Sequence, residues 1–423
     1  MADSVTWRCM NTAARDIGAH SLRHDGEVIG LVALAHGTSH FFHLLIPPLF
    51  PFLMRDFGLG YAQVGFLMTV FFVISGAGQA AAGFVVDRIG ARPVLLFGVG
   101  ALALSGVALG LAPNYAGLVL AAAIAGVGNA VFHPTDFTLL NRRVSHPRLG
   151  HAFSMHGLAG NVGWALAPIT LFPLAQWQGW SVAAFVAAAV GALVFVLLWW
   201  RRQALTDVAR STVVDARRGA AQAGSGDALA FLRSTAVWLC FLFFFFSTGA
   251  AGILQNYAPA LLGKVYGVDL AFATSCLTAY LVGSAGGMLA GGFAAGRFER
   301  SESVIALALA ASAVVAAAIA TGLLTPWTVL GSMAVMGFGV GFAGPSRDLL
   351  VRKAATQRFG RASYGRVYGF VYSGLDVGLA LSPVIFGPLL DRGAFLAVLA
   401  CVAVLQIAAL LAALLVGRHA PAS

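Results

Sequence analysis

Residues 61–110 read YAQVGFLMTVFFVISGAGQAAAGFVVDRIGARPVLLFGVGALALSGVALG, two long apolar runs separated by a short charged loop. The charged residues of this stretch are Asp87, Arg88 and Arg92, which lie close together in that loop. A run of about 20 apolar residues is long enough to cross a bilayer as a helix. The stretch therefore predicts two membrane-spanning helices joined by a tight polar turn.

The same pattern continues through the whole chain. Of its 423 residues, 59% are hydrophobic and 10% are charged, whereas a soluble domain carries about 25% charged residues. We therefore expect an all-α membrane protein with twelve transmembrane helices. The expected spans are 28–53, 61–86, 93–112, 115–140, 150–174, 180–200, 231–262, 271–296, 303–324, 327–350, 365–390 and 394–416.

The basic residues predict the orientation. Of 26 Lys and Arg residues, Arg55, Lys264 and Arg392 fall in loops on one side and Arg347 falls within a span, while all others lie on the opposite side. Because basic loops stay in the cytoplasm, both termini are expected there. The expected organisation is a cytoplasmic tail (1–27), a six-helix bundle (28–200), a cytoplasmic linker (201–230), a second six-helix bundle (231–416) and a cytoplasmic tail (417–423).

The two halves repeat each other. GHAFSMHGLAGNVGWALAP (150–168) aligns without gaps on GRVYGFVYSGLDVGLALSP (365–383), and 126–136 aligns on 337–347, which places Asp136 opposite Arg347. Two parallel repeats build transporters whose substrate site lies between the halves. We expect two pseudo-symmetric six-helix bundles around a central cavity.

Several classes of function are disfavoured. The net charge of +10 sits in short loops between apolar runs, so it determines topology and does not indicate nucleic-acid binding. The four cysteines are far apart in the chain and fit no metal or redox spacing. We find no nucleophile–base set and no phosphate-cradling loop. The sequence predicts a protein that is not an enzyme, needs no cofactor, has no dedicated metal site and is not driven by ATP.

The loop between the second and third spans carries a motif. Gly83, Asp87, Arg88, Gly90 and Arg92 have the spacing of the signature loop of the major facilitator superfamily, which the chain resembles. In that superfamily the loop latches the halves when the protein is closed to the inside, so the resemblance implies a gating role for these residues. Asp87 is expected to hold the positive N-terminal end of a neighbouring helix.

A narrower resemblance lies in the fourth and fifth spans. Phe132-His133-Pro134 and the pattern of residues in the fifth span are similar to the fosmidomycin-resistance branch of the superfamily. This implies an antiporter for drug efflux and antibiotic resistance, driven by protons. We expect a monomer in the bacterial cytoplasmic (inner) membrane. Ala122 and Asn161 depart from the antiporter motifs, so the proton step must use other residues. The matching residues of the fifth span are Gly150, Ala152, Ser154, Gly160, Asn161, Gly163 and Pro168.

Histidines are concentrated in the first half. His36, His40 and His43 share one face of the first span because they are four and three residues apart. His133 and His156, on the fourth and fifth spans, are expected at a similar depth to His36. A neutral imidazole titrates near pH 6.5 and also contacts substrates. We expect His36, His40 and His133 to exchange protons, and all of these rings except His43 to contact substrate.

Further polar residues complete the predicted site. Asp376 is an isolated carboxyl near mid-membrane, where burial penalises its charged form, so it is the expected proton carrier. Arg347 can clamp an anionic group of the substrate or pair with Asp136 as a gate. Asp136, His156 and Asn161 are assigned to substrate binding.

These residues predict secondary transport by alternating access, with protons and a small molecule as ligands. The preferred interpretation is proton-coupled export of a small amphipathic or anionic compound. Two alternatives use the same residues. One is proton-coupled uptake of an organic anion, and the other is transport of a divalent metal or metal chelate through the histidines. A membrane sensor without flux is a further class.

Overall fold

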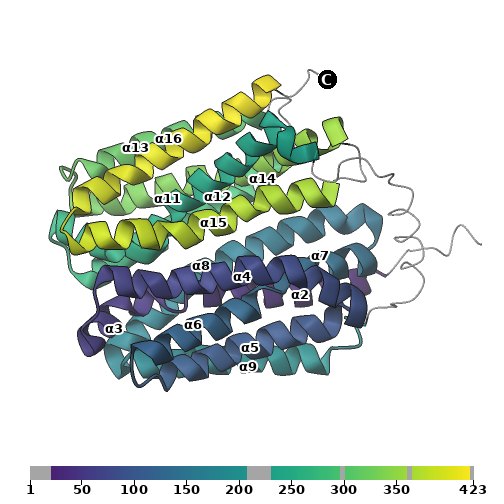
Figure 1. Cartoon of the computed structure of the whole chain (residues 1–423), viewed down its shortest axis with the longest axis horizontal. Coiled ribbons are helices and arrows are strands. Elements are labelled where there is room, and N and C mark those ends of the chain that lie inside the picture. The colour runs from purple at the N-terminus through teal and green to yellow at the C-terminus, as the bar shows by residue number, and fades with distance from the viewer. Residues whose placement is uncertain (1–20, 207–229, 296–300, 360–363, 420–423) are drawn as a thin grey trace, which may run out of the picture.

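The computed structural model describes residues 21–206, 230–295, 301–359 and 364–419, and these ranges contain helices and no strand. Figure 1 shows two bundles lying against each other, the N-terminal half in purple to teal and the C-terminal half in green to yellow. Within the described residues, twelve helical segments are long and apolar enough to cross a membrane. The expected all-α, twelve-span architecture is therefore confirmed.

The helices of the N-terminal half are α2 (Leu22–His43), α3 (Phe50–Phe57), α4 (Tyr61–Ile89), α5 (Ala91–Gly110), α6 (Tyr115–Asn129), α7 (Phe132–Arg143), α8 (Leu149–Gln178) and α9 (Trp180–Trp200). Those of the C-terminal half are α11 (Thr235–Tyr266), α12 (Leu270–Ala294), α13 (Ser301–Ala320), α14 (Pro326–Phe359), α15 (Tyr364–Asp391) and α16 (Phe395–His419). Short 3-10 turns are η1 (Pro47–Leu49), η2 (His146–Arg148) and η3 (Ala230–Arg233).

Several helices run past their expected limits. α2 begins at Leu22, because Ser21 caps it by accepting a hydrogen bond from the His24 amide, so the end of the expected tail 1–27 is helical. α14 continues to Phe359 and α16 to His419. Such polar extensions project beyond the apolar part of a span, where hydropathy gives no signal. Most of the expected linker 201–230 lies outside the described residues.

Two spans are interrupted. The first stops at His43 and resumes through η1 and α3, because Pro47 and Pro48 have no amide hydrogen to continue the helix. The fourth expected span, 115–140, is divided into α6 and α7 at Ala130 and Val131, which we had not expected. Pro134 explains this break, since proline has no amide hydrogen and its ring clashes with the carbonyl four residues earlier.

Glycines allow close helix packing within each half. A Cβ on Gly163 of α8 would lie 2.1 Å from the carbonyl oxygen of Gly37 on α2. On α12, a Cβ on Gly287 would lie 2.0 Å from the carbonyl oxygen of Phe338 on α14. The helices are therefore in contact backbone to backbone, the arrangement that small residues permit in membranes.

The two halves meet along α4 with α15 and along α8 with α12 (Figure 1). Asp391, at the end of α15, accepts hydrogen bonds from the Tyr61 and Ala62 amides at the start of α4, at 2.7 and 3.0 Å. A carboxylate on the first amides of a helix is favourable because these amides have no partner within the helix. We call this side of the bundle the Asp391 end and the opposite side the Asp87 end.

Candidate functional site

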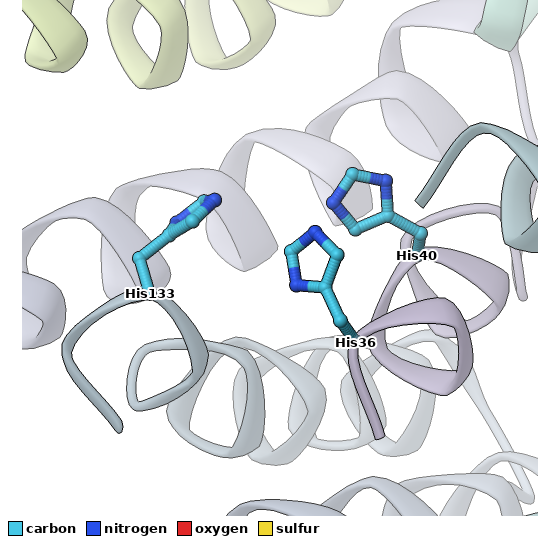
Figure 2. Close-up of side chains that lie close together, drawn as sticks. All are labelled: His36, His40 and His133. Carbon is cyan, nitrogen blue, oxygen red and sulfur yellow. The ribbon is translucent and has the colours of Figure 1, made fainter. Parts of the chain in front are cut away.

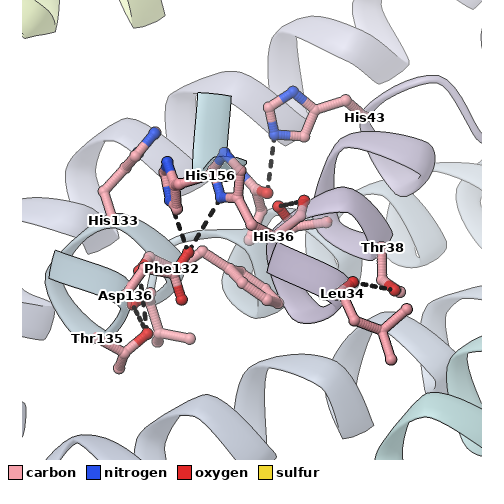
Figure 3. A network of polar contacts seen from close by, with 12 residues as sticks. Leu34, His36, Thr38, His43, Phe132, His133, Thr135, Asp136 and His156 are labelled. Carbon is pink, nitrogen blue, oxygen red and sulfur yellow. Dashed lines mark hydrogen bonds and ion pairs between the residues drawn. The ribbon is translucent and has the colours of Figure 1, made fainter. Parts of the chain in front are cut away.

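The structure brings five of the predicted residues into one cluster, and Figure 3 labels four of them, His36, His133, Asp136 and His156. The rings of His36 and His156 stack with centroids 3.5 Å apart. The His36 centroid lies 4.4 Å from that of His40 and 5.5 Å from that of His133. Asp136 lies beneath these rings. The cluster belongs to α2, α7 and α8, within the N-terminal half.

Local structure explains this convergence. His36 and His40 are one turn apart on α2, so they point to the same side of the helix. The break before α7 places His133 and Asp136 in its first turns, where they face α2. Gly160 and Gly163 let α8 approach α2 closely, and a Cβ on Gly160 would lie 2.8 Å from His40 Nδ1. The cluster therefore depends on helix packing that excludes side chains at these two positions.

The carboxylate of Asp136 is fully buried and joins two of the rings. Its Oδ2 lies 3.0 Å from His36 Nδ1 and 3.1 Å from His156 Nε2. An ionised carboxylate only accepts hydrogen bonds, so both ring nitrogens donate. The second oxygen, Oδ1, has no hydrogen-bond partner among the described residues. A buried charge with an unsatisfied oxygen is costly, so this group favours a proton or cation nearby.

The remaining histidines differ in how their nitrogens are used. His133 Nδ1 lies 2.7 Å from the amide oxygen of Gln79 on α4 and donates to it. Within the described part of the chain, the buried Nδ1 of His40 has no hydrogen-bond partner. One ring nitrogen each of His36, His40 and His133 lies within 4.8 Å of the other two, and so do ligand atoms of His36, Asp136 and His156. Both triads are compatible with a bound cation.

His43 belongs to the packing around the cluster. Its Nε2 lies 2.8 Å from Asn129 Oδ1, and Trp164 Nε1 donates to its Nδ1 at 3.4 Å. Asn129 in turn donates to Ser75 at 2.7 Å. With both nitrogens engaged, His43 is not available to a ligand, which agrees with its expected minor role.

Two predicted residues lie where the halves touch. Asn161 on α8 accepts a hydrogen bond from Ser284 on α12 at 3.0 Å. Asp376 on α15 packs against α4, where a Cβ on Gly76 would lie 3.1 Å from the Asp376 Cβ. Asp376 is partly exposed and makes no hydrogen bond within the described residues. The two side chains thus lie at different contacts between the halves.

Arg347 lies apart from the histidine cluster. Its guanidinium carbon is 4.8 Å from the ring centroid of Phe244 on α11, and the side chain is partly exposed. The guanidinium therefore stacks on an aromatic face, as arginine commonly does. The hydrogen bonds of Asp136 go to the two histidines and not to Arg347 in this conformation.

The predicted gating residues surround the turn between α4 and α5. Gly90 ends α4 with a φ of 89°, a conformation that side chains rarely adopt, which explains a glycine there. The Asp87 carboxylate is 76% exposed and lies 4.0 Å from the guanidinium of Arg142. Arg92 donates to Thr206 at 3.0 Å, Arg88 is exposed, and a Cβ on Gly83 would meet nothing within 4 Å.

Several residues that orient the cluster were not predicted from the sequence. Gln79 fixes His133, Asn129 and Trp164 fix His43, and none of these had been singled out. Gln79 and Asn129 carried a usable signal, because an amide side chain within an apolar span needs a polar partner. The identity of the partner depends on tertiary packing and could not be inferred from spacing.

Comparisons with known proteins agree with this architecture. A family model described as Major Facilitator Superfamily matches residues 32–363. The fosmidomycin resistance protein of Escherichia coli (strain K12) is 32% identical over 169 residues, which cover 40% of this chain and 41% of that protein. The membrane sensor protein UhpC of the same organism is 24% identical over 356 residues, covering 80% and 79%.

A solved structure shows the same fold. The crystal structure of a bacterial homolog to the human lysosomal transporter Spinster, in an inward-facing and occupied conformation, has a TM-score of 0.69. The sequences are 15% identical, and the match covers 94% of this chain and 98% of the other.

Proposed function

The chain belongs to the Major Facilitator Superfamily, and on that premise we propose that it exports a small amphipathic or anionic compound in exchange for protons. As a member of this family it is an integral membrane transporter and not an enzyme. Small-molecule transport follows from the family; export, proton coupling and the class of compound are the proposal.

The observation that carries the proposal is the burial of several ionisable groups at one level of the bundle. His36 and His156 are 3% and 6% exposed, and Asp136 is fully buried between them. Ionisable side chains inside a membrane protein are costly and usually serve transport. In the proposal, His36, His40, His133, Asp136, His156 and Asn161 contact the substrate, and the first three also exchange protons.

The C-terminal half supplies the second part of the mechanism. Asp376 lies at the contact of α15 with α4, where movement of the halves changes its surroundings. A carboxyl that is alternately enclosed and exposed can bind a proton in one state and release it in the other. Arg347 clamps an anionic group of the substrate through its planar guanidinium.

Gating completes the cycle. The Asp391 end is held closed by the bonds from Asp391 to α4. In the proposal, the loop of Gly83, Asp87, Arg88, Gly90 and Arg92 closes the opposite end. The distribution of basic residues supports a cytoplasmic Asp87 end and cytoplasmic termini. A monomer in the bacterial inner membrane is part of the proposal.

Two observations bear on the direction of transport. The 32% identity with the fosmidomycin resistance protein over 169 residues favours export. Arg347 suits an organic anion equally well in uptake by proton symport, which is the second candidate. The similarity to UhpC, which is described as a membrane sensor protein, makes a sensor the third candidate function.

Flux in proteoliposomes with an imposed pH gradient tests the proposal, with labelled fosmidomycin and a panel of small organic anions as probes. An antiporter accumulates the probe in an acidic lumen, because protons leave as the probe enters. A symporter accumulates it only when the outside is acidic. If no probe moves in response to either gradient, the proposed export is wrong.

A further inference from the structure

Two buried imidazoles and one partly buried imidazole converge in the N-terminal half. Figure 2 shows His36 and His40 on one helix and His133 on another, with ring nitrogens directed at the space between the rings. One nitrogen of each residue lies within 4.8 Å of the other two. His36 and His40 are 3% and 9% exposed. This arrangement differs from a packed aromatic cluster, since polar ring atoms face each other.

Neighbouring helices hold two of these rings in a defined tautomer. His36 donates through Nδ1 to Asp136 at 3.0 Å, and His133 donates through Nδ1 to Gln79 at 2.7 Å. In a neutral imidazole the other nitrogen, Nε2, then carries a lone pair. A histidine that ligates a metal almost always has its second nitrogen bonded in this way to a carboxylate or another oxygen.

His40 supplies an independent observation. Its Nδ1 is buried and has no hydrogen-bond partner among the described residues. A buried polar nitrogen without a partner is unfavourable, so this ring is suited to bind something that the protein itself does not supply. The His43 and Trp164 rings also pack on His40, with centroids 4.7 and 4.4 Å away, but their nitrogens are bonded to each other and to Asn129 and not to His40.

Helix α8 places its backbone at Gly160 directly against two of these nitrogens, so only a small ligand held by the rings themselves fits there. A Cβ on Gly160 would lie 2.8 Å from His40 Nδ1 and 3.2 Å from His36 Nε2. Three nitrogens on a tetrahedral zinc ion lie roughly 3.4 Å apart, given bonds of about 2.0–2.1 Å. Ring movements of about 1 Å would therefore bring the observed nitrogens into range.

We propose that His36, His40 and His133 bind a divalent transition-metal ion of the kind that prefers imidazole, such as Zn²⁺ or Ni²⁺, as part of the transported substrate. Imidazole is a good ligand for these ions. The inference rests on the proposed transport function and names the chemistry of its cargo. The ion enters either bare or as the centre of a small organic chelate, whose acidic groups would then reach toward Arg347.

The full chain is purified with an affinity tag that contains no histidine. Metal binding is then measured by calorimetry with Zn²⁺ and by the absorption spectrum of the Co²⁺ complex. We expect one ion per chain and a Co²⁺ spectrum of nitrogen ligation. His36→Gln, His40→Gln and His133→Gln should each weaken binding at least tenfold. His43→Gln is the matched control and should change affinity less than twofold, because both of its nitrogens are already engaged.

A second variant separates orientation from ligation. Asp136→Asn keeps the shape of the side chain but removes the carboxylate that fixes His36, and loss of such a partner typically costs about 10- to 100-fold in metal affinity. Size-exclusion chromatography and thermal unfolding confirm that each variant is folded. Equal affinity in all variants, or no binding of one ion per chain by the parent, would overturn the metal site.

Flux of labelled Zn²⁺, supplied alone or as its citrate complex, distinguishes the two sources. Transport of Zn²⁺ supplied alone identifies the bare cation as the transported species, and transport only in the presence of citrate identifies a metal chelate. The two proposals fail differently. Gradient-driven flux of an organic probe without metal binding overturns the metal site alone, while metal binding without any flux leaves the site and overturns transport.

Discussion

Asn161 and Asp376 occupy equivalent positions in the two repeated segments, yet their surroundings differ. Asn161 lies at the α8–α12 contact, where it accepts from Ser284 and donates to Met288 Sδ at 3.2 Å. Asp376 lies at the α15–α4 contact against Gly76 and makes no hydrogen bond within the described residues. The repeat thus places one polar side chain at each contact between the halves, and only one of them can ionise.

This difference suggests a division of labour. A neutral amide with satisfied hydrogen bonds holds two helices together at little electrostatic cost. A carboxyl without partners gains or loses a proton according to its surroundings. We therefore interpret the α8–α12 contact as a hinge and the α15–α4 contact as the place where proton binding is coupled to movement.

The largest expected effect comes from replacing the carboxyl at the α15–α4 contact by an amide, so that neither contact between the halves can ionise. Asp376→Asn should abolish gradient-driven accumulation of substrate, because an amide cannot carry the proton, while substrate still binds. Asn161→Ala changes the other contact and should slow transport, but it leaves the carboxyl of Asp376 in place, so gradient-driven accumulation should persist. Flux in proteoliposomes measures both. Accumulation by Asp376→Asn at the parental level would make this carboxyl structural.

The next effect tests the other equivalent pair, Asp136 and Arg347. Asp136 is bonded to His36 and His156, so we expect that exchanging the charges, Asp136→Arg with Arg347→Asp, does not restore transport. Arg347→Lys should also lose at least tenfold in rate, because a lysine lacks the planar fork. Recovery of activity in the double variant relative to either single one would instead identify a gate between the two residues.

The smallest effect concerns the two ends of the bundle. Asp391→Ala removes the hydrogen bonds that its carboxylate accepts from the first amides of α4. Asp87→Ala removes the interaction with a helix N-terminus that we expect when the Asp87 end is closed. Each interaction is worth about 0.3–1 kcal/mol, so each change should shift the ratio of the two states roughly two- to fivefold. The shifts should have opposite directions.

Alkylation of a single cysteine introduced by Phe153→Cys reports these shifts. Phe153 is 38% exposed at the Asp87 end, so labelling should slow with Asp391→Ala and accelerate with Asp87→Ala. The chain without the introduced cysteine is the control, because Cys240 and Cys276 are buried but Cys401 is partly exposed. Unchanged labelling in Asp87→Ala at equal expression would remove the latch from the proposed mechanism.

Much of the fold could be predicted from the sequence because lipid imposes a simple rule on apolar length. The break between α6 and α7 was not predicted, although Pro134 causes it, because Ala130 and Val131 continue an apolar run that hydropathy reads as one span. The end of α14, from 351 to Phe359, was not predicted because its residues are polar, and hydropathy ends the span where the apolar residues end although the helix continues. Helix limits follow hydrogen bonding, which hydropathy does not measure.

The cluster could be predicted in part. The spacing of His36 and His40 fixed their common face, and depth arguments placed His133 and His156 near them. The partners Gln79 and Trp164 could not be found in this way, because contacts between helices depend on rotation and packing. The close approach through Gly160 and Gly163 likewise requires coordinates.

The buried carboxylate of Asp136 has a consequence for the response to membrane voltage. With neutral imidazoles and an ionised Asp136, the cluster carries one negative charge; one bound proton brings it to zero, and one divalent ion brings it to one positive charge. Moving one elementary charge across the membrane is worth about 2.3 kcal/mol per 100 mV. Exchange of one divalent ion for two protons therefore moves no net charge, whereas exchange for one proton moves one charge per cycle and depends on the membrane potential. The current measured across a planar bilayer would give the number of protons exchanged per ion.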